Sequence, residues 1–458
     1  MMSTLMTASI DPTRFLSHTA GLAMVMGHFA YCKMTTSLPR SVSLDQRLAM
    51  LPRQNVPLAH RVVINWSARH IPFIEAESDT DLATALGFVQ AHLRIGQMEM
   101  LRHLSQGRVS ELIGPIAIDF DFFLRSLAPG RAVPLIMDGL PTETRQWLEA
   151  FVVGINHYLE HAKEVPHEFD VLNLKREPWS VSDVLRIGRL VAADTNWIVW
   201  FQLLRLHTRQ GWPRLWRRLI GSGRATDPDP MNFSGARLLQ ASQYPSWRGS
   251  NSVAVSGARS ATGAALMAND PHLGIHLPGP WLIAGYKSPS HHAVGLMAPG
   301  LPFIAIGRNP WIAWGGTNLH AASSDFYDVS NLRSDEISER RDTIRVRWWP
   351  DRQVVLRETK LGPIISDAHL LGLDRNKPIS LRWMGHWPSD EFTAMLKVNQ
   401  ARNWDDFRAA INGISVPGQM MTYADVHGHV RRGVAARLPA RKPHHLSGFL
   451  PVSYTHLT

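Results

Sequence analysis

The sequence predicts an α+β fold, because helical periodicity dominates its first half and short strands dominate its second half. Before residue 209, long segments repeat apolar residues at the three- and four-residue spacing of helices. After residue 250, the apolar runs are short and are separated by glycine, proline and asparagine turns. Stacked sheets with helices outside them would bury both patterns.

The composition is that of a globular protein. The chain has 458 residues, of which 45% are hydrophobic and 19% are charged, which excludes the disordered class. Its formal net charge of +10 comes from basic residues spread along the chain, so no nucleic-acid partner is expected. Cys32 is the single cysteine, which excludes an internal disulfide and a cysteine-based metal cluster.

Residues 1–60 are interpreted as a leader or irregular N-terminus. The apolar run 15–31 follows Arg14, as in a weak export signal, but histidines and glycines interrupt it and no small-residue cleavage site follows. The run is too short and too polar for stable membrane insertion. Two readings stay open: a signal that directs export, or an irregular leader on a cytoplasmic protein.

From residue 61 to residue 208 the chain is mostly helical. Ser180 is a plausible N-cap, with Asp183 at the third helical position. The predicted elements are strands at 62–66 and 71–74, and helices from Asp79 or Thr80 to about residue 104, from 142 to 163 and from 180 to about 208.

The segment 209–249 has no period, because glycines and prolines such as Gly211 and Pro213 interrupt it. We interpret it as a linker. The chain after it predicts strands at 252–255, 265–268, 281–286, 293–297, 303–306 and 312–314, a hairpin of 344–349 with 353–358, and helices at 390–399 and 404–411.

A chemically distinctive motif starts this second half. Gly249 and Ser250 precede an alternating strand, and the run 268–274 (ANDPHLG) then presents His272 in a turn. If Ser250 Oγ attacks the Gly249 carbonyl, one cleavage exposes both a hydroxyl nucleophile and an α-amine whose pKa is about 7.7 to 8.0, suited to act as its base. An isolated Gly-Ser-Asn triplet is usually an ordinary turn, so the surrounding sequence decides.

That surrounding sequence resembles a known family. The runs 248–257 (RGSNSVAVSG) and 268–274, with 299–302 (PGLP), 307–309 (GRN) and 312–318 (IAWGGTN), are similar to the start of the mature β chain of the penicillin acylase (penicillin amidase) family. The helical run 91–102 is similar to the family's α chain. These enzymes are N-terminal nucleophile hydrolases, so the resemblance implies their four-layer αββα sandwich.

The resemblance also implies an organisation of the chain. Residues 61–208 correspond to the α chain, 209–249 to an excised linker and 250–450 to the N-terminal part of the β chain. An α/β heterodimer from one precursor, exported to the periplasm or secreted, is therefore expected. The run 451–458 (PVSYTHLT) resembles a translated cloning adapter, so we expect a non-native tail on a truncated β chain.

Site residues follow from the same resemblance. Ser250 would be the nucleophile and, through its amine, the general base, with cleavage between Gly249 and Ser250. His272 would contact that amine, although such a histidine is more often a turn residue. The backbone N–H of Asn318 would help to form the oxyanion hole, and Arg441 would order the site.

One position departs from the family pattern. Where the family carries an asparagine that supplies the second oxyanion donor, this sequence has Met420. A thioether cannot donate a hydrogen bond. Three explanations stay open: the protein is catalytically impaired, Gln419 takes over after a register shift, or the sequence contains an error.

The expected mechanism requires no cofactor. The family resemblance also implies a structural calcium ion, but this sequence matches its ligand positions only in part. Asp325 matches a ligand position and Gln202 is the nearest candidate for a second one, but Ala322 replaces an acidic residue. Calcium needs several oxygen ligands.

The expected function is an amidohydrolase that cleaves the acyl amide of a small molecule, such as a penicillin or cephalosporin, an N-acyl homoserine lactone or a related N-acyl compound. The alternative is an unprocessed, impaired homologue that acts as a binding protein. The sequence has no Gly-x-Ser-x-Gly elbow, His-Glu-x-x-His motif or phosphate-binding loop, which argues against other hydrolase and nucleotide-enzyme classes.

Overall fold

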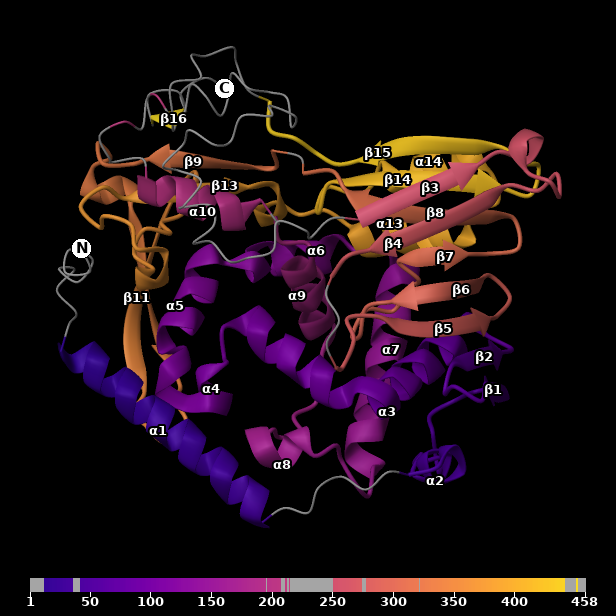
Figure 1. The fold of residues 1–458 in the computed structure, drawn as a ribbon, viewed down its shortest axis with the longest axis horizontal. Helices are drawn as coiled ribbons and strands as arrows, with labels where there is room; N and C mark the ends of the chain where they lie inside the picture. The colour runs from indigo at the N-terminus through magenta and orange to yellow at the C-terminus, as the bar shows by residue number, and fades with distance from the viewer. Residues whose placement is uncertain are drawn as a thin grey trace.

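A computed structural model describes residues 12–35, 42–194, 196–206, 211, 214, 250–273, 277–320, 322–440 and 450–451. Helices form most of the first half and strands most of the second half, which confirms the α+β class (Figure 1).

The first half contains two strands, β1 (Val62–Trp66) and β2 (Pro72–Ala76). Its helices are α1 (Pro12–Thr35), α2 (Leu44–Ala49), α3 (Asp79–Gln106), α4 (Ser110–Ile113), α5 (Ile118–Leu127), α6 (Val133–Gly139), α7 (Thr142–His161), α8 (Glu168–Leu172), α9 (Val181–Val191) and α10 (Trp197–Leu206). Residues 1–60 are therefore more regular than expected, since α1 and α2 lie there. None of the helices in the described part of the chain has the length and hydropathy that a bilayer span needs.

The second half supplies the remaining strands and two helices. The helices are α13 (Glu391–Gln400) and α14 (Trp404–Ile411). The strands are β3 (Ser250–Val255), β4 (Leu266–Pro271), β5 (Leu282–Lys287), β6 (His292–Met297), β7 (Ile306–Arg308), β8 (Ile312–Asn318), β9 (Ser324–Asp328), β10 (Ser338–Ile344), β11 (Arg352–Thr359), β12 (Gly362–Pro363), β13 (Ile379–Trp383), β14 (Gln419–Asp425), β15 (Val430–Ala435) and β16 (Leu450–Pro451).

Local signals position several helices. The side chain of Ser78 caps α3 by accepting a hydrogen bond from the backbone N–H of Asp81. The predicted capping box at Ser180 and Asp183 is present at the start of α9. The helix expected from 180 to about 208 is two helices, α9 and α10, with a break between them that lets each helix pack in a different hydrophobic cluster.

Helices α3 and α7 pack closely through two glycines. A Cβ added at Gly87 would lie 1.9 Å from the carbonyl oxygen of Phe151, and one at Gly154 would lie 1.9 Å from that of Thr84. Only glycine permits this approach of the two backbones. The pair forms the base of the main core, against which the large sheet packs.

The large sheet has eight strands in the order β1-β2-β5-β6-β7-β8-β14-β15. Strand β2 pairs in parallel with β5, so the two halves of the chain share one sheet. Apolar side chains of α3, α7, α13 and α14 cover one face of it. The antiparallel ribbon of β3 and β4 crosses the other face at β8 and β14, where the Asn269 side chain lies against Gly315 (Figure 1).

Helices, sheet and ribbon are thus successive layers of the expected αββα sandwich. The outer face of the ribbon is open within the described residues, since Val253 is 58% exposed.

Two strand predictions need correction. Residues 303–305 lie in a loop and β7 begins at Ile306, because Phe303 and Ile304 are buried as core residues outside the sheet. The hairpin at 344–358 instead pairs β10 with β11, and residues 345–351 form its turn. Trp348 has a φ of 63° there, which a continuing strand would not allow.

Candidate active site

Ser250 is the first residue of β3 and pairs with Pro271, the last residue of β4. Side chains alternate along a strand, and Asn251 and Val253 are exposed whereas Ser250 and Ser252 are partly buried. The Ser250 hydroxyl is therefore on the inner side of the ribbon. Gly249, the other residue of the predicted cleavage site, lies outside the described residues.

Ser250 lines a cavity of about 290 Å³ between the sheet and helices α6, α9 and α13. Most of its walls are apolar, and they include Leu185, Phe303, Phe392 and Met395. A concave apolar pocket with a few polar groups is the usual form of a small-molecule site. Its walls come from both halves of the chain.

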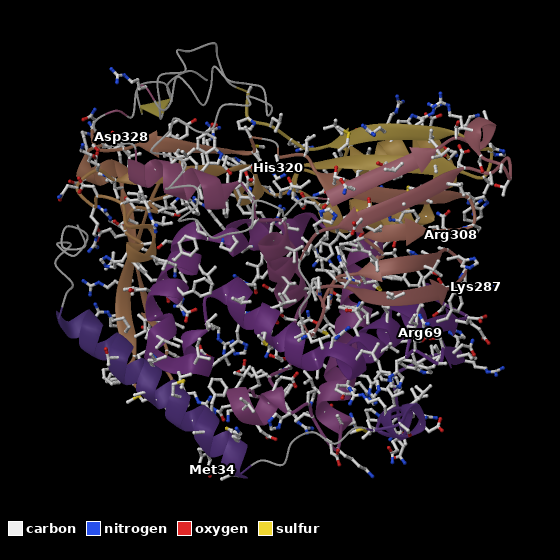
Figure 2. All side chains as sticks on the ribbon, in the orientation of Figure 1. Met34, Arg69, Lys287, Arg308, His320 and Asp328 are labelled. Carbon is white, nitrogen blue, oxygen red and sulfur yellow. The ribbon has the colours of Figure 1, made fainter. Side chains whose placement is uncertain are left out.

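Asn318 lines the same cavity. It is the last residue of β8 and pairs with Gln419, the first residue of β14, which also lines the cavity. The structure therefore brings Ser250, Asn318 and Gln419 to one cavity, and the role of Asn318 in an oxyanion hole stays a prediction. Two residues further along, His320 lies between the large sheet and the part that carries β9 and β13 (Figure 2).

Met420 has a different position. Gln419 and Met421 line the cavity and Met420 does not, as the alternation of side chains in β14 dictates. A Cβ built on Gly316 would lie 3.0 Å from Met421 Sδ and 3.2 Å from Gln419 Oε1, so the Gln419 amide lies on the helix-covered face of the sheet. Gln419 thus shares the helix-side face with the core residue Met421, whereas Met420 lies on the face that the ribbon of Ser250 crosses. Both positions stay candidates for the side-chain donor, and the assignment of Met420 to the oxyanion position stays an untested prediction.

His272 follows β4 in the turn. Its Nε2 lies 2.8 Å from Asp270 Oδ2, and the two side chains are 37% and 73% exposed. Its neighbours Pro271 and Leu273 line the cavity, but His272 does not. The contact of His272 with the Ser250 amine stays a prediction, as does the role of Arg441, which lies outside the described residues.

The calcium site expected at Asp325 and Gln202 stays a prediction. Asp325 lies in β9 opposite Arg382, and Gln202 lies in α10, where its side chain is outside the description. The described residues contain no group of three or more histidine, cysteine or acidic side chains arranged for a metal. Asp194 accepts hydrogen bonds from the hydroxyls of Ser323 and of Ser324, the first residue of β9.

The sequence analysis missed Arg189, which is buried on α9 and lines the cavity. Its Nη2 donates to the carbonyl oxygen of Ser389 at 2.8 Å and to Ser389 Oγ at 2.9 Å, and lies 3.2 Å from Glu391 Oε2. Burial lowers the pKa of Arg189, and the carboxylate of Glu391 opposes this. Arg189 could have been identified from its position in the sequence. It follows Leu185 by four residues, which places an arginine on the apolar stripe of α9.

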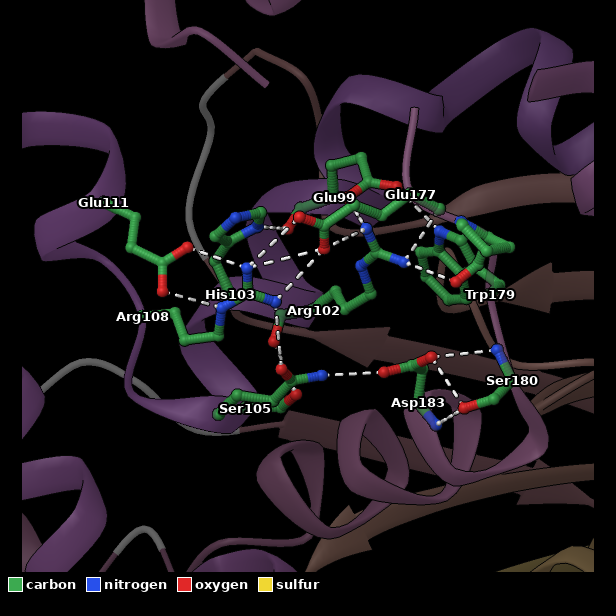
Figure 3. A network of polar contacts seen from close by, with 12 residues as sticks. Glu99, Arg102, His103, Ser105, Arg108, Glu111, Glu177, Trp179, Ser180 and Asp183 are labelled. Carbon is green, nitrogen blue, oxygen red and sulfur yellow. Dashed lines mark hydrogen bonds and ion pairs between the residues drawn. The ribbon is translucent and has the colours of Figure 1, made fainter. Parts of the chain in front are cut away.

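A second buried network holds the start of α9 (Figure 3). Glu99 is fully buried, lies 2.9 Å from Arg102 Nη2 and accepts a 2.7 Å hydrogen bond from Trp179 Nε1. Burial raises the pKa of Glu99 to about 7, although Arg102 and Trp179 favour its charged form. At the edge of this network, Gln106 Nε2 donates to Asp183 of the α9 capping box. The network therefore fixes the helix that carries Arg189.

Known proteins are similar to this chain. Penicillin acylase 2 proenzyme of Pseudomonas sp. (strain SE83) is 28% identical over 426 residues, covering 83% of this chain and 53% of that protein. Acyl-homoserine lactone acylase QuiP of Pseudomonas aeruginosa is 28% identical over 369 residues, covering 71% of this chain and 42% of that protein. The chain thus spans about half the length of these relatives.

Among solved structures, a thermostable penicillin G acylase from Alcaligenes faecalis matches with a TM-score of 0.38 and 22% identity, covering 44% of this chain and 38% of that one. The family model for penicillin amidase matches residues 61–455, which is most of the chain. The protein therefore belongs to the penicillin amidase family.

Proposed function

We propose that this protein is an amidohydrolase that cleaves the acyl amide of a small molecule through an acyl-enzyme on Ser250. The observation that carries the proposal is that Ser250, Asn318 and Gln419 line one largely apolar cavity. The relatives named as a penicillin acylase and as acyl-homoserine lactone acylases support a substrate among the N-acyl compounds.

The first step is maturation. Ser250 Oγ attacks the Gly249 carbonyl, the C–N bond between the two residues breaks, and water hydrolyses the resulting ester. The products are a free carboxylate on Gly249 and a free α-amine on Ser250. We propose that the two chains stay together as an α/β heterodimer, because both halves of the sequence contribute strands to one sheet and walls to one cavity. Export to the periplasm or secretion is proposed from the family resemblance alone.

Catalysis then repeats the same chemistry on a substrate. The Ser250 amine takes the proton from Oγ as Oγ attacks the acyl carbonyl, and later delivers it to the leaving amine. The tetrahedral oxyanion accepts hydrogen bonds from the Asn318 backbone N–H and, in our proposal, from the Gln419 side-chain amide. Water then attacks the acyl-enzyme and releases the acid. The apolar walls hold the acyl group and exclude bulk water.

Hydrolysis assays on a panel of phenylacetyl, fatty-acyl and dicarboxylic-acyl amides test this proposal, with release of the free amine as the readout. Wild-type protein should release amine, and Ser250→Ala should release none. Ser252→Ala is the matched control, because Ser252 lies on the same face of β3 two residues further along. Equal hydrolysis by wild type and Ser250→Ala would exclude Ser250 as the nucleophile. An intact, inactive wild-type chain would favour the binding-protein alternative.

A further inference from the structure

Helix α1 lies along the outside of the molecule and exposes apolar side chains over much of its length (Figure 1). Met26 is 64% exposed, and Met34, at the end of α1 in Figure 2, is 79% exposed. The other large apolar side chains that α1 exposes are Leu22, Met24, Phe29 and Tyr31. An apolar surface of this kind on a folded protein marks contact with another molecule or with lipid.

The opposite face of α1 is fixed to the body of the protein. Gly21, Val25, His28 and Cys32 follow one another at helical spacing, so they share this face. Val25 and Cys32 are buried. A Cβ added at Gly21 would lie 2.8 Å from the Pro115 ring, and His28 Nε2 lies 2.6 Å from the carbonyl oxygen of the last residue but one of α8. The apolar outer face of α1 is therefore held towards the surroundings.

Two exposed tryptophans, Trp348 and Trp349, continue this surface in the turn between β10 and β11. The Trp348 ring lies 5.1 Å from the His28 ring of α1, and the Arg347 guanidinium lies 4.2 Å from the centre of the Trp348 ring. Trp348 has a φ of 63°, which strains a bulky residue. A Cβ added at Gly114 would lie 3.0 Å from the Trp348 ring, so close packing holds the ring in place. Tryptophan and arginine beside an apolar helix are typical of a membrane–water interface.

The charges on this surface are mostly positive. Residues 12–35 contain one arginine, one lysine and no acidic residue. The turn adds Arg345, Arg347 and Arg352, with Asp351 as its acidic residue. A second copy of this chain would bring these positive charges against each other, which disfavours self-association. The anionic headgroups of a bilayer would complement them.

We propose that α1 and the turn between β10 and β11 bind the surface of an anionic lipid bilayer. Because no helix in the described part of the chain can cross a membrane, α1 lies in the plane of the interface. Its apolar side chains enter the headgroup region, while Lys33 and the arginines of the turn reach the lipid phosphates. Among the described residues, none of α1 or of this turn lines the cavity, so lipid binding does not depend on the chemistry proposed for Ser250.

Vesicle flotation with the whole chain tests the proposal. Intact mass would first establish that α1 is present in the protein used. The chain should bind vesicles of mixed phosphatidylglycerol and phosphatidylethanolamine about tenfold or more tightly than vesicles of phosphatidylcholine, because several basic side chains contribute. Added salt should weaken that binding, since it screens exposed charges.

A variant of three substitutions tests the apolar contribution. Leu22→Gln, Met26→Gln and Phe29→Gln together leave the charge unchanged and should weaken binding to the anionic vesicles about tenfold or more. A matched control places glutamine at three exposed apolar positions on other elements and should bind as the wild type does. The control substitutions are Leu135→Gln, Val153→Gln and Ile283→Gln.

A second variant tests the charge. Arg345→Gln with Arg352→Gln should weaken binding to the anionic vesicles about tenfold and change binding to phosphatidylcholine little, because both arginines are exposed. Native circular dichroism would show that each variant is folded.

Four results would overturn the proposal. These are no vesicle binding by a folded whole chain, equal binding to both kinds of vesicle, unchanged binding by the variant with three substitutions in α1, and unchanged binding by the double arginine variant. If the wild type instead forms a dimer in size-exclusion chromatography that the α1 variant abolishes, and binds no vesicles, the surface belongs to a second copy of the chain.

Discussion

Two regions of this molecule each contain a buried arginine, a glutamate and a tryptophan, and both leave guanidinium nitrogens without a hydrogen-bond partner among the described residues. Beneath the start of α9, Trp179 Nε1 donates to Glu99, and Arg102 Nη1 donates to backbone carbonyl oxygens. Arg102 Nη2 lies 2.9 Å from Glu99 Oε2, but neither Nη2 nor Nε has a hydrogen-bond partner among the described residues. At the cavity, Glu391 is again paired with an arginine, but Arg189 Nη1 and Trp281 Nε1 have no acceptor among the described residues. Arg102 and Arg189 are equally buried, with side chains 3% exposed. Neither burial nor hydrogen-bond satisfaction therefore separates a structural network from a binding site, and what separates these two regions is that Arg189 and Trp281 line the cavity.

The largest stability effect is expected in the network of Glu99, Arg102 and Trp179. At pH 8, Glu99→Leu leaves Arg102 and Trp179 without the carboxylate, and removing one member of a buried pair costs about 3 to 5 kcal/mol. Chemical denaturation would measure this loss. Glu177→Gln is the control, because the Glu177 side chain is 46% exposed and its pair with Arg102 should be worth about 1 kcal/mol or less. Equal losses for the two variants would mean that the network does not support the fold.

The cavity region should respond in activity instead of stability. Gln419→Leu should lower kcat about 10²- to 10³-fold, because it removes a donor to the oxyanion, whereas Met420→Leu should change kcat little. Stopped assays on fully processed protein would measure both. Met420→Asn decides between the two positions, since a gain of that size in kcat would place residue 420 in the oxyanion hole and remove Gln419 from it.

The pH dependence of the free energy of unfolding should reveal the raised pKa of Glu99. The pKa of Glu99 is raised from 4.5 to about 7 in the folded state. Glu99 therefore keeps its proton to a higher pH in the folded protein than in the unfolded chain, and the protonated form stabilises the fold. This contribution is fully present below about pH 4.5 and falls as pH rises towards 7. The difference in unfolding free energy between wild type and Glu99→Gln should therefore change by up to about 3 kcal/mol across that window. A constant difference from pH 4 to pH 8 would contradict the raised pKa.

The smallest expected effect is at the cap of α9. Ser180→Ala removes the side-chain acceptor for the Asp183 backbone N–H and should cost about 1 kcal/mol of unfolding free energy. Ser182→Ala, on the same helix but not at its cap, should cost less than about 0.5 kcal/mol. If the two variants are equally stable, the capping box contributes nothing measurable.

Sequence reasoning succeeded where the determining interactions are local. The cap at Ser180 and the bounds of α14 follow from residues within one or two helical turns. Strand β1 was also predicted with the bounds that the structure shows.

Pairings between residues far apart in the chain could not be predicted from the sequence. Strand β13 pairs with β9 across more than 50 residues, and neither strand was predicted. Arg189 and Glu391 are about 200 residues apart, so the pair exists only because α9 and α13 meet at the cavity. For the same reason the sequence could not show which face of β14 meets the cavity, and the competition between Gln419 and Met420 needed the strand register. Ser250 and Asn318 were found because the family motif names them, and the structure brings them to one cavity.

The central claim is that Ser250 becomes a chain terminus. N-terminal sequencing of purified protein, together with its intact mass, tests this most directly. The account predicts that the wild-type protein contains a fragment that begins Ser250-Asn251-Ser252, and that Ser250→Ala remains one uncleaved chain. A wild-type protein that stays whole, or a fragment that begins at any other residue, would contradict it.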